Sequence, residues 1–186
     1  MVVGLPLNLS GQKRASRLAV AERRPVYTRP FDIIQGARAF ELWVPVFDGD
    51  VLAHGLPPTV AALKARIQRA DGVLIVTPEF NFSVPGGLKN VLDWLGRGHD
   101  QPWPFKPVAI ASASGGPLGG ARMQYDLRKV MVFLDMPAVN QPEVMISAAA
   151  TKFDQSGNLT DDTAKKLIGQ LLTNLCELAK RYGAKG

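Results

Sequence analysis

Short, uninterrupted apolar runs alternate with segments of helical period along this 186-residue chain, and this alternation constrains its fold most. The runs GVLIVT at residues 72–77 and KPVAIASAS at residues 106–114 are built largely from β-branched or small residues. A strand that shows no polar alternation is one that is covered on both faces, as in a parallel sheet. Each run is followed by a helical segment, so the pattern predicts a parallel, doubly wound α/β sheet with helices on both faces.

Three further segments have strand character. Residues 1–9 are predicted to form an opening strand, and residues 138–148 a weaker one because Pro142 interrupts it. Residues 40–44, FELWV, are a candidate short strand. Residues 22–40 show no clear period and receive no assignment.

Four segments have helical period. The last, residues 160–183, has Thr160 as its expected N-cap, aspartates in its first turn, and basic residues with Gly183 at its end. In the other three, residues 59–70, 88–96 and 120–134, the apolar stripe is expected to face inward. These inward positions are Val60, Leu63, Ile67, Ala70, Leu88, Val91, Leu92, Leu95, Leu127, Val130, Met131 and Leu134.

The composition indicates one soluble globular domain over residues 1–186 and limits the kinds of ligand that the chain is expected to bind. Apolar residues make up 46% and charged residues 20%, and no apolar stretch approaches the ~20 residues of a membrane span. The net charge of +6 is spread along the chain, which favours small anionic ligands over nucleic acid. The single cysteine, Cys176, and the absence of a secretory pattern predict a cytoplasmic location.

Three loops are expected at the carboxyl ends of strands, where ligands bind in an open α/β sheet. Residues 10–16, SGQKRAS, offer hydroxyls and cations before a helix start, which suits a phosphate. Residues 77–87 offer a carboxylate, an amide and a phenyl ring between prolines, and residues 113–122 offer four glycines that allow close backbone approach. Together they suit a mononucleotide, although each loop taken alone is also explained as a turn of the chain.

The second and third loops resemble a known family. TPEFNFSVPGGLKNVLDWLGR, beginning at Thr77, is similar to the signature of the NAD(P)H-dependent FMN reductases, in the branch with quinone, chromate and azo-compound reductases. That signature has a tyrosine where this chain has Phe80. SASGGPLGGARMQYDLR, beginning at Ser112, resembles the second family loop, and PVFDGD, beginning at Pro45, resembles a third family segment.

The resemblance implies a flavodoxin-like fold with five parallel strands in the order 2-1-3-4-5. It also implies noncovalently bound FMN, with NADPH or NADH as electron donor. Electrons would pass through the flavin by a ping-pong mechanism to quinones, chromate, azo compounds or flavins, with no catalytic side chain and no metal. A homodimer or homotetramer is implied as well. The residues implied to hold FMN are Ser10, Gly11, Lys13, Arg14, Ser16, Pro78, Glu79, Phe80, Asn81, Ser114, Gly115 and Gly116, and those implied to touch substrate or a partner subunit are Ser83, Arg122 and Tyr125. Backbone N–H groups at the helix start after Gly119 are expected to stabilise the charge of the reduced flavin.

The first loop departs from the family pattern. Ser10 and Gly11 are swapped relative to it, Lys13 replaces an arginine, and Leu18 replaces an asparagine. Lysine can neutralise a phosphate but lacks the bidentate fork of arginine. Two explanations stay open: a divergent loop that still binds FMN, or an altered reading frame in the N-terminal segment.

Two other functional classes stay open beside the reductase. One is a flavodoxin-type electron carrier without its own NAD(P)H site, although such carriers are acidic and this chain has a pI near 9.7. The other is a relative that kept the fold and lost FMN. Cys176, Trp94 and Trp103 are interpreted as structural residues, and His54 and His99 are too far apart in sequence to indicate a metal pair.

Overall fold

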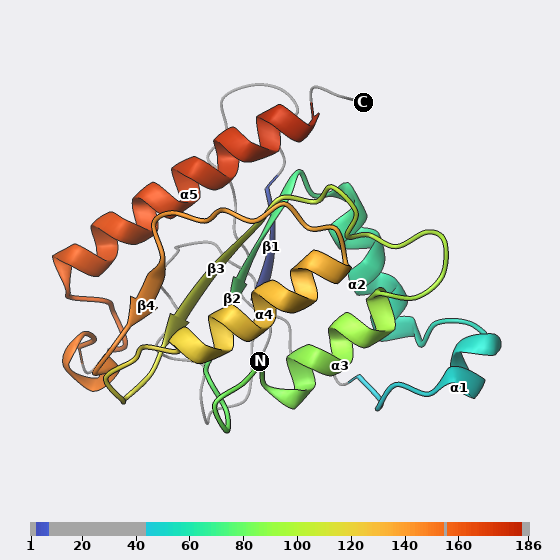
Figure 1. The fold of residues 1–186 in the computed structure, drawn as a ribbon, viewed down its shortest axis with the longest axis horizontal. Helices are drawn as coiled ribbons and strands as arrows, with labels where there is room; N and C mark the ends of the chain where they lie inside the picture. The colour runs from blue at the N-terminus through green and yellow to red at the C-terminus, as the bar shows by residue number, and fades with distance from the viewer. Residues whose placement is uncertain (1–2, 8–43, 155, 184–186) are drawn as a thin grey trace.

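A sheet in the order β1-β2-β3-β4 forms the centre of the described part of the chain, which in this computed structural model comprises residues 3–7, 44–154 and 156–183 (Figure 1). The elements are β1 Val3–Leu7, α1 Gly49–Ala53, α2 Pro58–Arg69, β2 Gly72–Val76, α3 Gly86–Leu95, β3 Val108–Ala113, α4 Ala121–Phe133, β4 Val144–Ile146, the 3-10 helix η2 Ala149–Thr151, and α5 Asp162–Gly183.

The predicted parallel core is present in β2, β3 and β4. Val73 of β2 pairs with Val108 of β3, and Ala111 of β3 pairs with Val144 of β4, both in parallel register. Helix α3 connects β2 to β3, and α4 connects β3 to β4. The sequence-based α/β assignment is therefore confirmed for this part of the sheet.

The direction of the first strand differs from the prediction of a parallel sheet. β1 pairs with β2 antiparallel, with Val3 opposite Val76 and Leu7 opposite Gly72. The chain therefore leaves β1 at the amino end of β2, not at its carboxyl end. The physical reason is that apolar character predicts a strand and its burial but not its direction, which depends on the connecting segment. That segment, residues 8–43, lies outside the described residues.

The five-stranded order 2-1-3-4-5 is not found among the described residues, which contain four strands. Of the candidate strand at residues 40–44, only Val44 is described, and it has no strand conformation. The segment at residues 138–148 forms a strand only over β4, apart from a single bridge between Val108 and Ala138.

The two faces of the sheet are covered by different helices (Figure 1). Val73 and Ile75 of β2 pack in a cluster with residues of α2, α3 and α4, whereas Leu74 packs in a second cluster with residues of α5. This alternation with period two is that of a strand buried on both faces. The predicted inward positions of the three helical segments are confirmed as buried, except Leu63 and Val130, which are partly buried against the same core.

The interpretation of three further residues as structural is confirmed. Trp94 and Trp103 are buried core residues, and Cys176 is partly buried against the α5 cluster. The expected cap of α5 is wrong by one residue. The Asp161 carboxylate, not the Thr160 hydroxyl, accepts the hydrogen bond from the Ala164 backbone N–H at 2.8 Å, because the helix begins at Asp162.

Among the described residues, no helix has both the length and the apolar character that crossing a membrane requires. The same residues contain no cluster of three or more His, Cys, Asp or Glu with metal-binding geometry.

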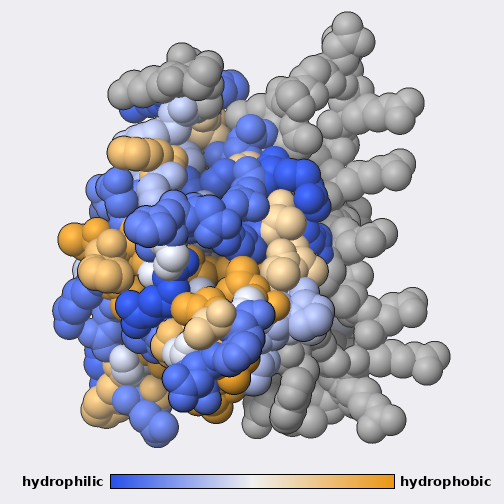
Figure 2. All heavy atoms as spheres, turned by 90° about the vertical axis from the view of Figure 1, so that its right-hand side faces the viewer, coloured by the Kyte–Doolittle hydropathy of each residue, from blue (hydrophilic) through white to orange (hydrophobic). Residues whose placement is uncertain are grey.

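Figure 2 shows the side of the molecule on which α1 lies, where hydrophobic and hydrophilic residues are interspersed. Val46 and Val51 are exposed large hydrophobic residues of the segment around α1. A cavity of about 370 Å³ lies between α3 and α4, lined in part by Leu92, Val130 and Leu134. Most of its lining residues lie toward the carboxyl ends of α3 and α4, whereas the loops after β2 and β3 precede the amino ends of these helices. The cavity is therefore separate from the strand-end loops.

Candidate functional site

Two of the three predicted loops leave the same edge of the sheet. The loop at residues 77–85 follows β2, and the loop at residues 114–120 follows β3, its parallel neighbour. The Thr77 N–H donates to the Ala111 carbonyl at 3.1 Å, which continues the β2–β3 ladder to the start of the loop. The third predicted loop, with Ser10, Gly11, Lys13, Arg14 and Ser16, lies outside the described residues.

The loop after β2 contains a tight hairpin. Phe80 and Ser83 exchange two backbone hydrogen bonds, of 3.1 and 3.0 Å, across a turn formed by Asn81 and Phe82. Both turn residues have positive φ, 49° and 68°, as the type I′ class of two-residue hairpin turns requires. Asparagine tolerates this conformation, but phenylalanine rarely adopts it. The side chains of Phe80 and Phe82 are exposed by 53% and 66%.

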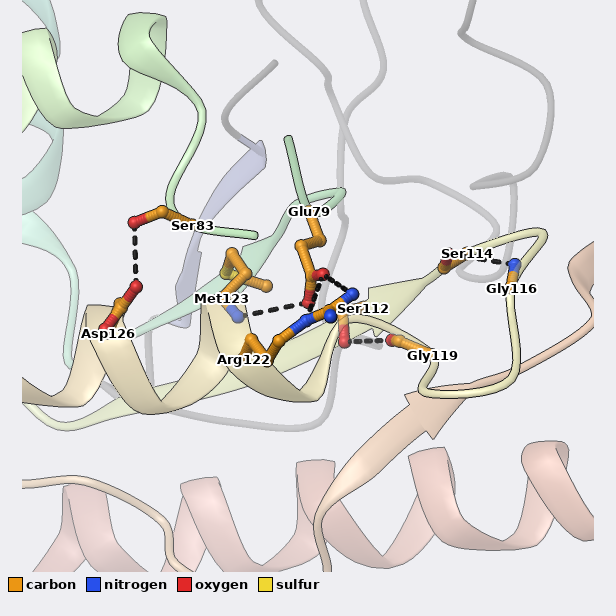
Figure 3. Close-up of polar contacts among 9 residues, drawn as sticks. All are labelled: Glu79, Ser83, Ser112, Ser114, Gly116, Gly119, Arg122, Met123 and Asp126. Carbon is orange, nitrogen blue, oxygen red and sulfur yellow. Dashed lines mark hydrogen bonds and ion pairs between the residues drawn. The ribbon is translucent and has the colours of Figure 1, made fainter. Parts of the chain in front are cut away.

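Glu79 braces this loop against α4 (Figure 3). Its Oε1 accepts from Nε of Arg122 at 2.8 Å and lies 2.6 Å from Nη2, while its Oε2 accepts from the Met123 N–H at 3.3 Å. Burial alone raises the pKa of Glu79, but the hydrogen bonds from Arg122 and Met123 outweigh it and hold the pKa below its ordinary value. The side chain is only 8% exposed, and both of its carboxylate oxygens accept hydrogen bonds from residues of α4.

This arrangement limits one expectation about the start of α4. The sequence leads us to expect that backbone N–H groups there stabilise the charge of a reduced flavin, but the Met123 N–H donates to Glu79 instead. A carboxylate at a helix N-terminus is a favourable partner for these groups and for the helix dipole. The sequence does not indicate this contact because Glu79 and Met123 are far apart along the chain.

Ser83 and Tyr125 also have partners within the chain. The Ser83 hydroxyl donates to Asp126 at 2.8 Å, and hydrogen bonds from Lys129 and then from Ser83 lower the pKa of Asp126. The Tyr125 hydroxyl donates to Glu143 at 3.3 Å, and this acceptor raises the pKa of the tyrosine. Tyr125 is nevertheless 53% exposed, so much of its ring surface faces outward.

The loop after β3 combines a rigid end with an open end. At the rigid end, Gly119 has a φ of 60°, and a Cβ there would lie 2.6 Å from the Met145 carbonyl carbon. At the open end, a Cβ on Gly115 would meet nothing within 4 Å. The Ser114 hydroxyl accepts from the Gly116 N–H at 3.1 Å, which shapes the turn between them (Figure 3).

A buried polar network beneath this loop is absent from the sequence-based predictions. The Ser112 hydroxyl donates to the Gly119 carbonyl at 2.6 Å, and Nε2 of Gln124 donates to the Ser112 hydroxyl at 2.8 Å. Nε2 of Gln124 also donates to the Val144 carbonyl at 2.9 Å. The one available signal is a polar residue on the inward face of a helix, because Gln124 lies one turn before the apolar Leu127. Through Ser112, this network connects the Gly119 carbonyl of the loop to α4 and β4.

The described loops fit the planar part of a flavin. Phe80 presents an exposed ring, Pro78 is half-buried beside it, and Gly115 leaves its backbone open at the same sheet edge. Such surfaces suit a flat aromatic group, since rings stack and glycine allows close backbone approach. Glu79 does not belong to the ligand-facing set in this arrangement, because its carboxylate is turned to Arg122.

The parallel strands β2, β3 and β4, with helices on both faces and open loops at their carboxyl ends, have the arrangement in which α/β proteins of the flavodoxin-like class bind nucleotides. Residues 11–151 match the family described as NADPH-dependent FMN reductase, and the chain belongs to this family. Family membership confirms the resemblance seen in the sequence, together with the enzyme class and the cofactors, FMN with NAD(P)H, that characterise the family.

Individual relatives agree with this family. An NAD(P)H-dependent FMN reductase of Pseudomonas aeruginosa is 48% identical over 132 residues, which cover 71% of each chain. A quinone reductase of Escherichia coli K12 is 52% identical over 131 residues, which cover 69% of this chain and 70% of that protein. The solved structure of FerB, a flavoenzyme NAD(P)H:(acceptor) oxidoreductase from Paracoccus denitrificans, superposes with a TM-score of 0.66 at 33% identity, over 75% of this chain and 76% of that one.

Proposed function

We propose that the protein is an NAD(P)H:quinone oxidoreductase that holds FMN between the loops after β2 and β3. The observation that carries the proposal is the pairing of a braced hairpin, which exposes Phe80, with the open Gly115 backbone at the same sheet edge. The proposal is supported by the quinone reductase that is 52% identical over most of both chains.

The reaction is the two-electron reduction of a quinone: NAD(P)H, a proton and a quinone give NAD(P)⁺ and a hydroquinone. FMN, when bound, supplies the chemistry by accepting a hydride and passing two electrons on. The residues proposed to contact its ring are Pro78, Phe80, Asn81, Ser114, Gly115 and Gly116. The assignment of its phosphate to Ser10, Gly11, Lys13, Arg14 and Ser16 stays a proposal about residues outside the described part of the chain. It requires these residues to reach the carboxyl edge of the sheet, because β1 ends beside the amino end of β2. The chain's own contribution is to orient two flat substrates in turn and to shield them from water.

Several finer features belong to the same proposal. One binding site that serves donor and acceptor in turn gives ping-pong kinetics. Chromate, azo compounds and free flavins are further acceptors in this proposal. The protein is proposed to act in the cytoplasm as a homodimer or homotetramer, without nucleic-acid or membrane partners.

The test is the steady-state oxidation of NADPH by the FMN-loaded protein with a naphthoquinone as acceptor, varying both substrates. The proposal predicts turnover well above that of free FMN at equal concentration, and parallel lines in double-reciprocal plots. Turnover no faster than that of free FMN would eliminate the reductase. Retained FMN without NADPH oxidation would instead indicate an electron carrier of the flavodoxin type.

A further inference from the structure

Arg122 makes two different contacts with the loop after β2. One edge of its guanidinium, Nε and Nη2, meets Oε1 of Glu79 at 2.8 and 2.6 Å. Its Cζ lies 3.5 Å from the centre of the Phe82 ring, which is a close cation–π contact. Arg122, in the first turn of α4, therefore contacts residues on either side of Phe80, and Figure 3 shows its contact with Glu79.

The hairpin needs such support because its own backbone is unfavourable. Phe82 has a φ of 68°, a conformation that a residue with a bulky side chain keeps only where surrounding contacts hold it. Helix α4 provides those contacts, from Arg122 to Glu79 and Phe82, from the Met123 N–H to Glu79, and from Asp126 to Ser83. The hairpin is thus attached to one helix through several side chains.

These contacts also determine the position of the exposed Phe82 ring. Phe82 remains 66% exposed although the guanidinium lies over its ring, so much of the ring is open to a ligand. Phe80, two residues away in the same hairpin, is also exposed. A flat quinone can stack on such a ring, whereas an octahedral metal complex cannot.

We propose that Arg122 is a positioning residue that holds the Phe82 ring at the edge of the site and thereby sets the affinity for flat aromatic acceptors. The proposal rests on the proposed quinone reductase function. Lysine cannot replace Arg122 here, since only a planar guanidinium can pair with a carboxylate through its edge and stack on a ring through its face.

The first test compares Arg122→Lys, Phe82→Leu and the double variant, with a naphthoquinone or ferricyanide as acceptor. Each single variant is expected to raise KM for the naphthoquinone about fivefold, the effect of losing one cation–π contact, and to change KM for ferricyanide less than about twofold. Because both substitutions remove the same contact, the double variant is expected to resemble either single variant.

Arg97→Lys is the matched control. The Arg97 guanidinium also lies over an aromatic ring, that of Phe47, at 5.4 Å, but it follows the end of α3, away from the hairpin. This variant is expected to leave the naphthoquinone KM unchanged. Equal KM values for wild type, Arg122→Lys and Phe82→Leu would overturn the proposal, and so would effects that simply add in the double variant.

The second test needs no turnover. Hydrogen exchange of the Phe80 and Ser83 amides, which pair across the hairpin, is measured in the protein without added cofactor. Arg122→Lys is expected to accelerate both amides at least about fivefold relative to wild type and Arg97→Lys, as the lost contact implies. Unchanged exchange would overturn the positioning role. A wild-type protein that fails to oxidise NADPH, yet shows the accelerated exchange in Arg122→Lys, would instead refute the proposed function alone.

Discussion

Gly119 is the residue at which the loop after β3 has least freedom. Its φ is 60°, and a Cβ at this position would lie 2.6 Å from the Met145 backbone, so both features disfavour any side chain. Gly119→Ala is therefore expected to lower the free energy of unfolding by about 2 kcal/mol or more, because backbone on both sides must shift. Urea denaturation followed by circular dichroism measures the change.

The matched variant is Gly115→Ala in the same loop. Gly115 has open space around it, so its substitution is expected to change stability by less than about 0.5 kcal/mol. Equal losses for the two variants would contradict the assignment of a rigid end and an open end to this loop.

Glu79 connects stability to pH. Its pKa in the folded protein lies below the ordinary value of 4.5, so the ionised carboxylate stabilises the fold fully above about pH 4.5. That contribution is lost as the pH falls through the folded-state pKa. Glu79→Gln is expected to cost about 1 kcal/mol at pH 7, and the difference from wild type is expected to shrink below about pH 4.5.

The measurement is a series of urea unfolding curves for both proteins between neutral pH and the acid limit of folding. A difference between wild type and Glu79→Gln that stays constant down to the lowest pH would show that the carboxylate does not carry the charge-dependent contact with Arg122.

Single residues also mark how far the sequence predicts the site. The motif around Phe80 predicts the loop and its place at a strand end, because local spacing and composition encode both. The orientation of Glu79 is not predictable from that motif, since its partner Arg122 belongs to another motif and meets it only through the tertiary fold. The cation–π contact of Phe82 has the same origin.

At the scale of elements, periodicity predicts buried faces better than it predicts the ends of helices. The apolar stripe of α3 is buried as expected at Leu88, Val91, Leu92 and Leu95. This works because a stripe averages over several turns, whereas a helix end depends on one or two side chains. The cap of α5 is the example, since Asp161 takes the role expected of its neighbour Thr160.

The cap assignment leads to a stability prediction for α5. Asp161→Ala is expected to lower the free energy of unfolding by about 1 kcal/mol, because the Ala164 N–H loses its acceptor and the carboxylate also pairs with Lys152. Thr160→Ala is expected to cost roughly half as much, since it removes only a hydroxyl that donates to the Lys152 carbonyl. Thermal unfolding compares the two, and a larger loss in Thr160→Ala would refute the assignment.

At the scale of the whole molecule, the sheet shows what apolar patterning leaves undetermined. The parallel neighbours β2, β3 and β4 are joined by crossover connections that contain a helix, which allow their parallel direction. β1 is joined to the rest through residues 8–43, much of which has no clear period in the sequence. The antiparallel pairing of β1 with β2 is accordingly the feature that sequence reasoning missed.

Backbone proton contacts test this pairing directly. The structure predicts nuclear Overhauser effects between Val3 and Val76 and between Leu7 and Gly72, the opposed residues of the antiparallel ladder. A parallel β1 would instead bring Val3 near the Gly72 end of β2. Contacts of the second kind in the isotope-labelled protein would contradict the described sheet.

The central claim is that this chain binds FMN and uses it to carry electrons from NAD(P)H to a quinone. The most direct measurement is the visible spectrum of the protein after incubation with FMN and desalting, followed by anaerobic addition of NADPH and then of a naphthoquinone. The account predicts about one retained flavin per chain, bleaching by NADPH, and recovery of the oxidised spectrum with the quinone. A protein that retains no flavin, or retains flavin that NADPH does not bleach, would contradict it.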